Sequence, residues 1–108
     1  MQLPRPTEHC QLCNRPDLPV TKHHLIPRGV HRRKRFRKAF DREDRLTRIL
    51  WVCRPCHNAI HAARSEQELA MHYNTREKLL AIPELYDFVA WIKHKPPGFR
   101  PKQRRPKG

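Results

Sequence analysis

Residues Trp51 to His61 read WVCRPCHNAIH, which places a Cys-x2-Cys pair directly before a His-x3-His pair. Cys53 and Cys56 have the spacing of a zinc knuckle, and a tetrahedral zinc site of this kind needs a second pair of thiolates. That pair stands upstream at Cys10 and Cys13, with the same spacing. The four cysteines therefore predict one structural Zn²⁺.

The histidines of the same stretch indicate a second metal. If the proline between the two cysteines opens a helix, His57 and His61 lie on one face of it, one turn apart. Cys56 would then lie about 100° around that helix from His57. One short helix could therefore present a thiolate to one ion and imidazoles to another. A doublet upstream, His23 and His24, supplies further imidazoles.

These motifs resemble the HNH endonucleases, also called ββα-metal or His-Me finger nucleases, in their form with a structural zinc. The resemblance rests on the first cysteine pair, on KHHLIPR at residues 22–28 and on CRPCHNAIH at residues 53–61. It implies an α+β fold, in which a small ββα-metal core with zinc knuckles is followed by C-terminal helices.

The family pattern also implies roles for the four histidines. His24 corresponds to the general base, and His23, His57 and His61 correspond to ligands of a catalytic divalent ion. An all-imidazole ligand set favours Zn²⁺, Ni²⁺, Co²⁺ or Mn²⁺ over Mg²⁺, although the family uses several ions, Mg²⁺ among them.

The sequence departs from the family pattern in the loop before the second cysteine pair. Family members usually carry an asparagine there, whereas this chain reads DRLTR at residues 44–48. The role of tying down that loop is therefore open, and Thr47 and Arg48 are the candidates for it.

Length and composition limit the fold to a single small domain. The chain has 108 residues, 37% of them hydrophobic, and 11 prolines, so its core is small and a metal would stabilise it. Its first ten residues, MQLPRPTEHC, contain no apolar signal segment, and no apolar run approaches the length that crosses a membrane. We expect a cytoplasmic protein with metal-bound cysteines rather than disulfides, and no membrane partner.

The charge indicates a polyanionic partner, for which DNA is the expected identity. The net charge is +14, and the densest basic run is HRRKRFRKAF at residues 31–40. As a helix, this run would dock its two phenylalanines and point its basic side chains outward; the alternative is a solvated loop. The predicted phosphate-binding residues are Arg28, Arg32, Arg33, Lys34, Arg35, Arg37 and Lys38.

The remaining pattern divides the chain into three segments. Residues 1–64 form the predicted nuclease core, with strands at 20–26 and 46–52, a turn at 41–44 and a helix at 54–64. Residues 65–94 form a helical C-terminal scaffold that starts with a capping box, and residues 95–108 form a basic, proline-rich tail, disordered when alone. Because side chains alternate along a strand, His23 and His24 should face opposite ways.

The function expected from these features is a metal-dependent DNA endonuclease that hydrolyses phosphodiester bonds, by nicking or double-strand cleavage, with low sequence specificity. Arg64 follows His61 by one turn and is the candidate clamp for the phosphate oxygens that are not cleaved. The alternative function is a non-catalytic zinc-ribbon module that binds DNA or RNA through the basic run and the tail.

The cysteine pattern makes a direct prediction about metal content. Elemental analysis of the purified protein should find one tightly held zinc ion, bound by Cys10, Cys13, Cys53 and Cys56. Cys10→Ser should unfold the N-terminal half, because metal binding supplies folding free energy in a chain with little core. Absence of zinc, or unchanged thermal melting of Cys10→Ser, would contradict the prediction.

Overall fold

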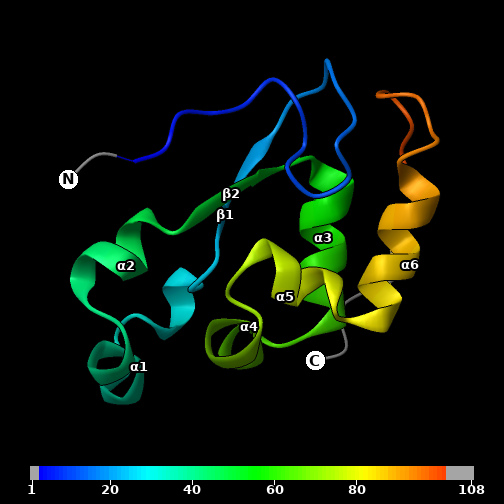
Figure 1. The fold of residues 1–108 in the computed structure, drawn as a ribbon. Coiled ribbons are helices and arrows are strands. Elements are labelled where there is room, and N and C mark those ends of the chain that lie inside the picture. The colour runs from blue at the N-terminus through cyan, green and yellow to red at the C-terminus, as the bar shows by residue number, and fades with distance from the viewer. Residues whose placement is uncertain (1–2, 102–108) are drawn as a thin grey trace.

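The computed structural model describes residues 3–101, and in this range the chain is a small mixed α+β protein of two strands, six α-helices and one short 3-10 helix (Figure 1). Strands β1 (Thr21–His24) and β2 (Ile49–Val52) pair in antiparallel orientation. None of the helices in residues 3–101 is long and apolar enough to cross a membrane. The helices are η1 (Arg28–Val30), α1 (Lys34–Ala39), α2 (Arg42–Thr47), α3 (Arg54–Ala63), α4 (Glu66–His72), α5 (Arg76–Leu80) and α6 (Pro83–Ile92).

The two strands are short, and their pairing sets the direction of the histidine doublet. His23 lies opposite Leu50 and His24 opposite Ile49. The side chains alternate as expected, because His23 is 1% exposed whereas His24 is only partly buried. The outer edge of β2 is covered by Gln11, whose Oε1 accepts from the backbone N–H of Trp51 at 2.8 Å. All four residues of β2 are buried, and Leu50 and Val52 belong to the main apolar cluster.

Helix α3 forms where the sequence predicts a helix. Cys53 is its N-cap residue and a proline stands in its first turn, where the missing N–H has no cost. Cys56 and Ile60 are fully buried toward the core, while His57 and His61 are partly buried on the neighbouring side. The helix packs against both β1 and α6. It therefore carries cysteine and histidine side chains into two different parts of the interior.

The C-terminal helices complete the same core that holds the cysteines. The capping box that the sequence predicts is present, since Ser65 and Glu68 each satisfy the other's backbone N–H at the start of α4. Buried leucines and isoleucines of α4, α5 and α6 join one apolar cluster with Cys10, Cys13, Cys53 and Cys56. The predicted scaffold thus packs directly on the cysteine pairs.

The prediction of a turn at residues 41–44 is wrong. Asp41 is the N-cap of α2 and accepts from the backbone N–H of Asp44 at 2.8 Å. Glu43 and Asp44 lie in the first turn, where carboxylates interact favourably with the helix dipole. Because this helix continues to Thr47, strand β2 starts at Ile49 and not at residue 46.

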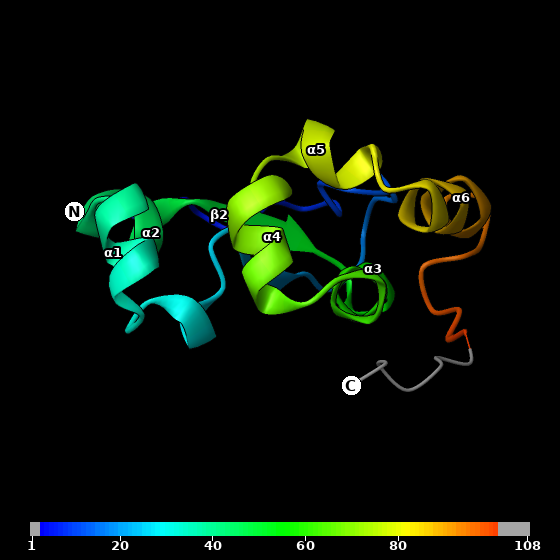
Figure 2. The same cartoon turned by 90° about the horizontal axis from the view of Figure 1, so that it is seen from below.

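Of the two structures considered for the dense basic run, residues 34–39 form a helix, and the run is anchored through its aromatic side chains. Phe36 is buried in a second apolar cluster with Ile26, Val30 and Ala70, and Phe40 packs against that cluster. We call residues 28–38 the basic arm. Figures 1 and 2 show α1 and α2 at the end of the molecule opposite α6. The basic side chains of the arm are all exposed: Arg28, Arg32, Arg33, Lys34, Arg35, Arg37 and Lys38.

The C-terminal segment differs from the predicted disordered tail over its described part. Residues 95–101 fold back onto the protein, and Phe99 packs against the main apolar cluster. The ring of Phe99 meets that of Trp91 edge to face, with 5.6 Å between centroids, and the ammonium of Lys95 lies over both rings. Residues 102–108 of the predicted tail lie outside the described residues. The first half of that tail is therefore part of the fold.

Candidate metal centres

The four cysteines meet at one buried point. Cys10, Cys13, Cys53 and Cys56 are all free of disulfides, and their sulfur atoms lie within 4.8 Å of one another. Sγ of Cys13 approaches Sγ of Cys53 to 3.9 Å. Four buried thiols in this arrangement could hold a zinc ion, as their sequence spacing predicts.

The first cysteine pair is shaped by a tight turn. The backbone N–H groups of Leu12 and Cys13 point at Sγ of Cys10, both at 3.4 Å, and the N–H of Asn14 donates to the carbonyl of Cys10 at 2.8 Å. Asn14 has φ of 63°, a left-handed conformation that asparagine tolerates better than most residues. The turn therefore aims two N–H donors at this sulfur, which favours a thiolate there. Hydrogen bonds with the neighbouring thiols outweigh this effect and raise the pKa of Cys10.

Arg15 is a residue of this site that the sequence analysis did not select. Arg15 is 3% exposed, and its guanidinium reaches Sγ of Cys13 through Nε at 3.5 Å and Sγ of Cys53 through Nη2 at 3.4 Å. Its Nη1 donates to the carbonyl of Pro96 at 2.9 Å. A buried cation beside a thiolate cluster offsets negative charge that would otherwise lack a counter-charge. A basic residue two positions after a knuckle cysteine was the available sequence signal.

Hydrogen bonds among the thiols favour ionisation of the two cysteines next to Arg15. The pKa of Cys13 is well below its usual value, chiefly because of its hydrogen bonding with Cys10, with Arg15 among the further causes. The pKa of Cys53 is lowered to about 6, again chiefly by Cys10. The same network raises the pKa of Cys10, chiefly through its hydrogen bond with Cys13, and that of Cys56, chiefly through its hydrogen bond with Cys10. Two of the four thiols are therefore favoured as thiolates, which is the form that binds metal.

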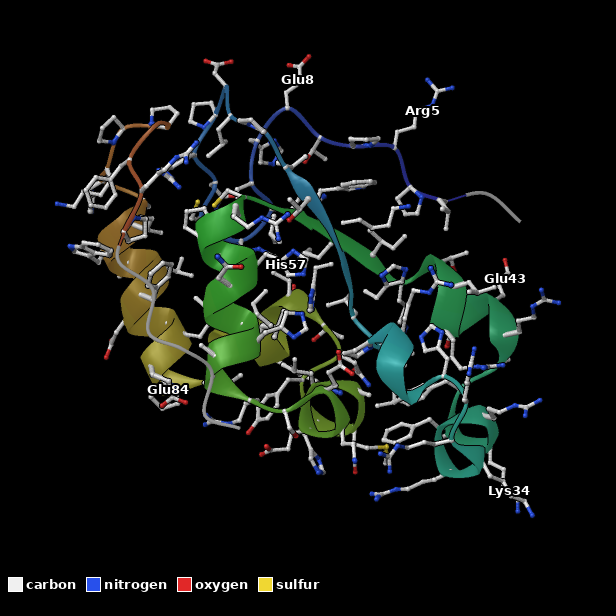
Figure 3. The ribbon with its side chains drawn as sticks, turned by 180° about the vertical axis from the view of Figure 1, so that it is seen from behind. Arg5, Glu8, Lys34, Glu43, His57 and Glu84 are labelled. Atoms are coloured by element: carbon white, nitrogen blue, oxygen red, sulfur yellow. The ribbon has the colours of Figure 1, made fainter. Side chains whose placement is uncertain are left out.

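A second cluster brings together one histidine of β1 and two of α3. Potential ligand nitrogens of His23, His57 and His61 lie within 4.8 Å of one another. The ring centroid of His23 is 5.3 Å from that of each α3 histidine, and those two are 5.1 Å apart. Figure 3 shows His57 inside the molecule, between α3 and β1. The structure thus gathers the three histidines that the sequence predicts as ligands.

The condition of His23 fits a metal ligand. Both of its ring nitrogens are buried and have no hydrogen-bond partner among the described residues. A buried polar group without a partner costs about 1–3 kcal/mol, so native structures rarely keep one without a reason. A cation held between the three rings would give His23 the partner that the surrounding protein does not provide.

Burial keeps these imidazoles neutral near neutral pH. Desolvation is the first cause that lowers the pKa of His23 to about 3 and that of His57 to about 4, and the neighbouring histidines of the cluster add to it. The pKa of His61 is also lowered, chiefly by burial. A neutral imidazole keeps a lone pair on one ring nitrogen, which is what a metal ion requires.

His24 lies next to this cluster but is not one of its three members. Its ring meets that of His31 edge to face, with 6.3 Å between centroids. The pKa of His24 is lowered, first by burial and then by the charges of Arg28, His31 and Lys22. The strand therefore directs one histidine of the doublet to the ligand cluster and leaves the other half-buried near cationic side chains.

Comparison with known proteins shows a relative but no assigned activity. The chain is 36% identical over 88 residues to the uncharacterized protein YisB of Bacillus subtilis (strain 168). The aligned region covers 82% of this chain and 76% of YisB. The chain belongs to the YisB family. It matches no protein-family model and no solved structure. Membership of the YisB family therefore assigns no chemistry to this chain.

The structure does not place Arg64 on the histidine face of α3. Arg64 is the C-cap residue of α3, and its backbone is extended (φ −144°, ψ 156°). Because the helix ends before Arg64, the helical spacing from His61 does not give the direction of its side chain. Its guanidinium pairs with the carboxylate of Glu84 and lies over the ring of Tyr73. These contacts occupy the group that the sequence suggested as a phosphate clamp.

The segment between the strands is tied down by a residue that sequence reasoning did not select. Nη1 of Arg45 donates to the carbonyl of His31 at 3.0 Å, which links α2 to the segment after η1. Of the two predicted candidates, Thr47 bonds within its own helix, to the carbonyl of Glu43 at 2.6 Å. Arg48 contributes its carbonyl, which accepts from the N–H of Leu25 at 2.9 Å.

The contacts of Arg15 predict its effect on metal retention. Arg15→Leu should release zinc to a chelator faster and bind it about 10- to 100-fold more weakly, because two sulfurs no longer have a charged donor. Arg15→Lys should recover part of the affinity, since an ammonium keeps the charge but not the forked geometry.

The matched control is Arg5→Leu, which removes an exposed arginine from the same N-terminal segment. Zinc affinity, measured by competition with a chromogenic chelator, should be unchanged in this control. Equal affinities of Arg15→Leu and wild type would show that Arg15 does not stabilise the metal-bound cysteines.

Proposed function

We propose that this protein is a metal-dependent DNA endonuclease of low sequence specificity that hydrolyses phosphodiester bonds. The observation that carries the proposal is the convergence of His23, His57 and His61, with His24 next to His23 on strand β1. A buried His23 without a hydrogen-bond partner among the described residues supports the view that the cluster serves an ion rather than packing alone.

The elements that supply the cluster support a ββα-metal core. Strands β1 and β2 pair in antiparallel orientation, α3 follows β2 directly, and α3 packs against β1. One ligand would come from the strand and two from successive turns of the helix. The resemblance of these sequence motifs to HNH endonucleases implies the same division of ligands between strand and helix.

The proposed chemistry divides between an ion and this chain's own side chains. A divalent ion held by His23, His57 and His61 would act as a Lewis acid toward a phosphate oxygen. His24 would accept the proton of the attacking water, and its lowered pKa keeps it neutral and able to do so near pH 7. The cationic groups that lower this pKa, Arg28 and Lys22, would also attract a phosphate to the same region.

The basic arm supports DNA as the substrate. Its seven basic side chains are exposed on one end of the molecule, and Figure 3 shows Lys34 pointing from α1 into solvent. Like charges at this density repel one another, and phosphates between them would relieve that repulsion. Arg28 belongs to the arm and also lies close enough to His24 to influence its pKa. The arm could therefore lead a DNA strand toward the histidines.

The second candidate is a non-catalytic zinc-ribbon module that binds DNA or RNA. Two observations favour it: the loop asparagine of the HNH pattern is missing, and Arg64 is paired with Glu84. A plasmid-nicking assay of zinc-loaded protein, with and without an added divalent ion, separates the two functions. Circular dichroism should accompany any chelator control, because a chelator that strips the cysteine site would also unfold the protein.

The proposed roles predict two distinguishable kinds of inactive variant. His24→Ala should lower the cleavage rate by about 10²- to 10⁴-fold while fold and DNA affinity persist, because only a proton acceptor is removed. His57→Ala should also be inactive, but added metal should partly restore it, because the ligand set is weakened rather than the base.

His94→Ala is the control, since it removes an exposed histidine beyond the end of α6. Its cleavage rate should equal that of the wild type. Cleavage by His24→Ala at the wild-type rate, or its full recovery with added metal, would show that the base and the ligands have been assigned wrongly.

The basic arm predicts a strong dependence of DNA binding on salt. The triple replacement of Lys34, Arg37 and Lys38 by Gln should reduce the steepness of the plot of log affinity against log salt concentration. The slope should change by roughly 0.9 for each phosphate of duplex DNA that the variant no longer neutralises. Fluorescence anisotropy at several salt concentrations measures this slope.

The matched control neutralises exposed basic residues outside the arm, namely Arg5, Lys78 and Lys93. We expect this triple variant to keep the wild-type slope. An equal flattening in the two triple variants would mean that DNA binding is spread over the surface and does not depend on the arm.

A further inference from the structure

The hydroxyl of Thr21 contacts both the sheet and the histidine cluster. Thr21 is the first residue of β1 and lies opposite Val52. Its Oγ1 is 2.9 Å from the carbonyl oxygen of Val52 and 2.8 Å from Nδ1 of His57. Both distances are those of hydrogen bonds, and the side chain is partly buried. In the sequence, Thr21 has no feature beyond the β-branched shape suited to a strand.

A count of protons decides the direction of both hydrogen bonds. A threonine hydroxyl has a single proton, and a carbonyl oxygen can only accept. The proton of Thr21 must therefore lie on the line to Val52, because two oxygens at 2.9 Å with no proton between them would repel each other. Oγ1 then has only lone pairs to offer His57, so Nδ1 of His57 carries the proton. The neutral ring is the Nδ1–H tautomer, and its lone pair is on Nε2.

We propose that Thr21 is a positioning residue that holds His57 as the Nδ1–H tautomer and so makes Nε2 available to a divalent cation shared with His23 and His61. The cation would belong to the class that prefers imidazole ligands, such as Zn²⁺, Ni²⁺ or Co²⁺. The metal role rests on the proposed function, whereas the tautomer follows from the contacts of Thr21 alone. Metal-binding histidines commonly donate their second ring N–H to a neighbouring acceptor in this way.

The anchoring of Thr21 explains why it can hold a ring in place. Its hydroxyl is fixed by the carbonyl of Val52, the residue directly before Cys53. Cys53 is in turn the N-cap of α3, the helix that carries His57. Oγ1 of Thr21 therefore links β1, the start of α3 and the ring of His57. The orientation of the ring depends on the junction between β2 and α3, where Cys53 of the cysteine cluster lies.

Nuclear magnetic resonance of the imidazole nitrogens tests the tautomer directly, on the full zinc-loaded chain with no second ion added. Wild-type His57 should show a protonated Nδ1 and an unprotonated Nε2 at neutral pH. Thr21→Ser keeps the hydroxyl and should keep this pattern, whereas Thr21→Val should show the Nε2–H form or a mixture. An Nε2–H tautomer in the wild type, or an unchanged tautomer in Thr21→Val, would overturn the proposal.

Titration of Ni²⁺ into the same zinc-loaded proteins tests the metal role. Thr21→Val should bind Ni²⁺ about 10- to 100-fold more weakly than wild type, and Thr21→Ser should stay close to wild type. Thr47→Val is the control, because Thr47 also donates its hydroxyl to a carbonyl, that of Glu43, and has no hydrogen bond to a histidine among residues 3–101. It should bind Ni²⁺ as the wild type does.

The outcomes separate this inference from the proposed function. Wild-type affinity for Ni²⁺ in Thr21→Val would overturn the role of Thr21 and leave the endonuclease proposal standing. A wild-type protein that binds no second ion would overturn the endonuclease proposal together with the metal role of Thr21, even where the Nδ1–H tautomer is observed.

Discussion

The constraint on which the rest of this structure depends is the meeting of four thiols at one buried point. One pair comes from a turn near the N-terminus and the other from the start of α3. Their contact joins segments far apart in the chain, since Cys13 and Cys53 are separated by 40 residues. The apolar cluster around them includes residues from β2, α3 and all three C-terminal helices. A chain with so small a core gains much of its stability where such a cluster is tied by a metal, because the metal affinity then contributes to folding.

Helix α3 transmits this constraint to the histidines. Its N-cap is Cys53 and its buried side carries Cys56, so the cysteine cluster sets both where the helix begins and how it is rotated. His57 follows Cys56 directly, and the rotation that buries the thiol therefore turns the imidazole toward β1. Thr21 then holds that ring from the strand. The two candidate metal centres are separate in their ligands but share one helix, and disorder at the first would misplace the second.

Exposed cationic charge is concentrated in the basic arm, and this supports the proposed function. The basic arm lies at the end opposite α6, where its side chains are exposed around a buried Phe36. Buried cationic charge is instead used internally, since Arg15 bridges two sulfurs and the carbonyl of Pro96. Buried Arg15 thus holds the C-terminal segment against the cysteine cluster, whereas the exposed arginines of the basic arm would attract a polyanion in the proposed function.

The sequence by itself determined the features that depend on neighbours within a turn or two. The cysteine spacing, the start of α3 at a proline, the capping box at Ser65 and the alternation of His23 and His24 are local signals, and each is found where it was expected. The same kind of signal, an N-cap aspartate at Asp41, was available for α2 and was overlooked. Only the tertiary structure decided that Arg64 pairs with Glu84, that Arg15 contacts Cys53 and Pro96, and that Thr21 meets His57. The partners in these contacts lie far apart in the chain, and packing of the core, rather than any local preference, brings them within hydrogen-bonding distance.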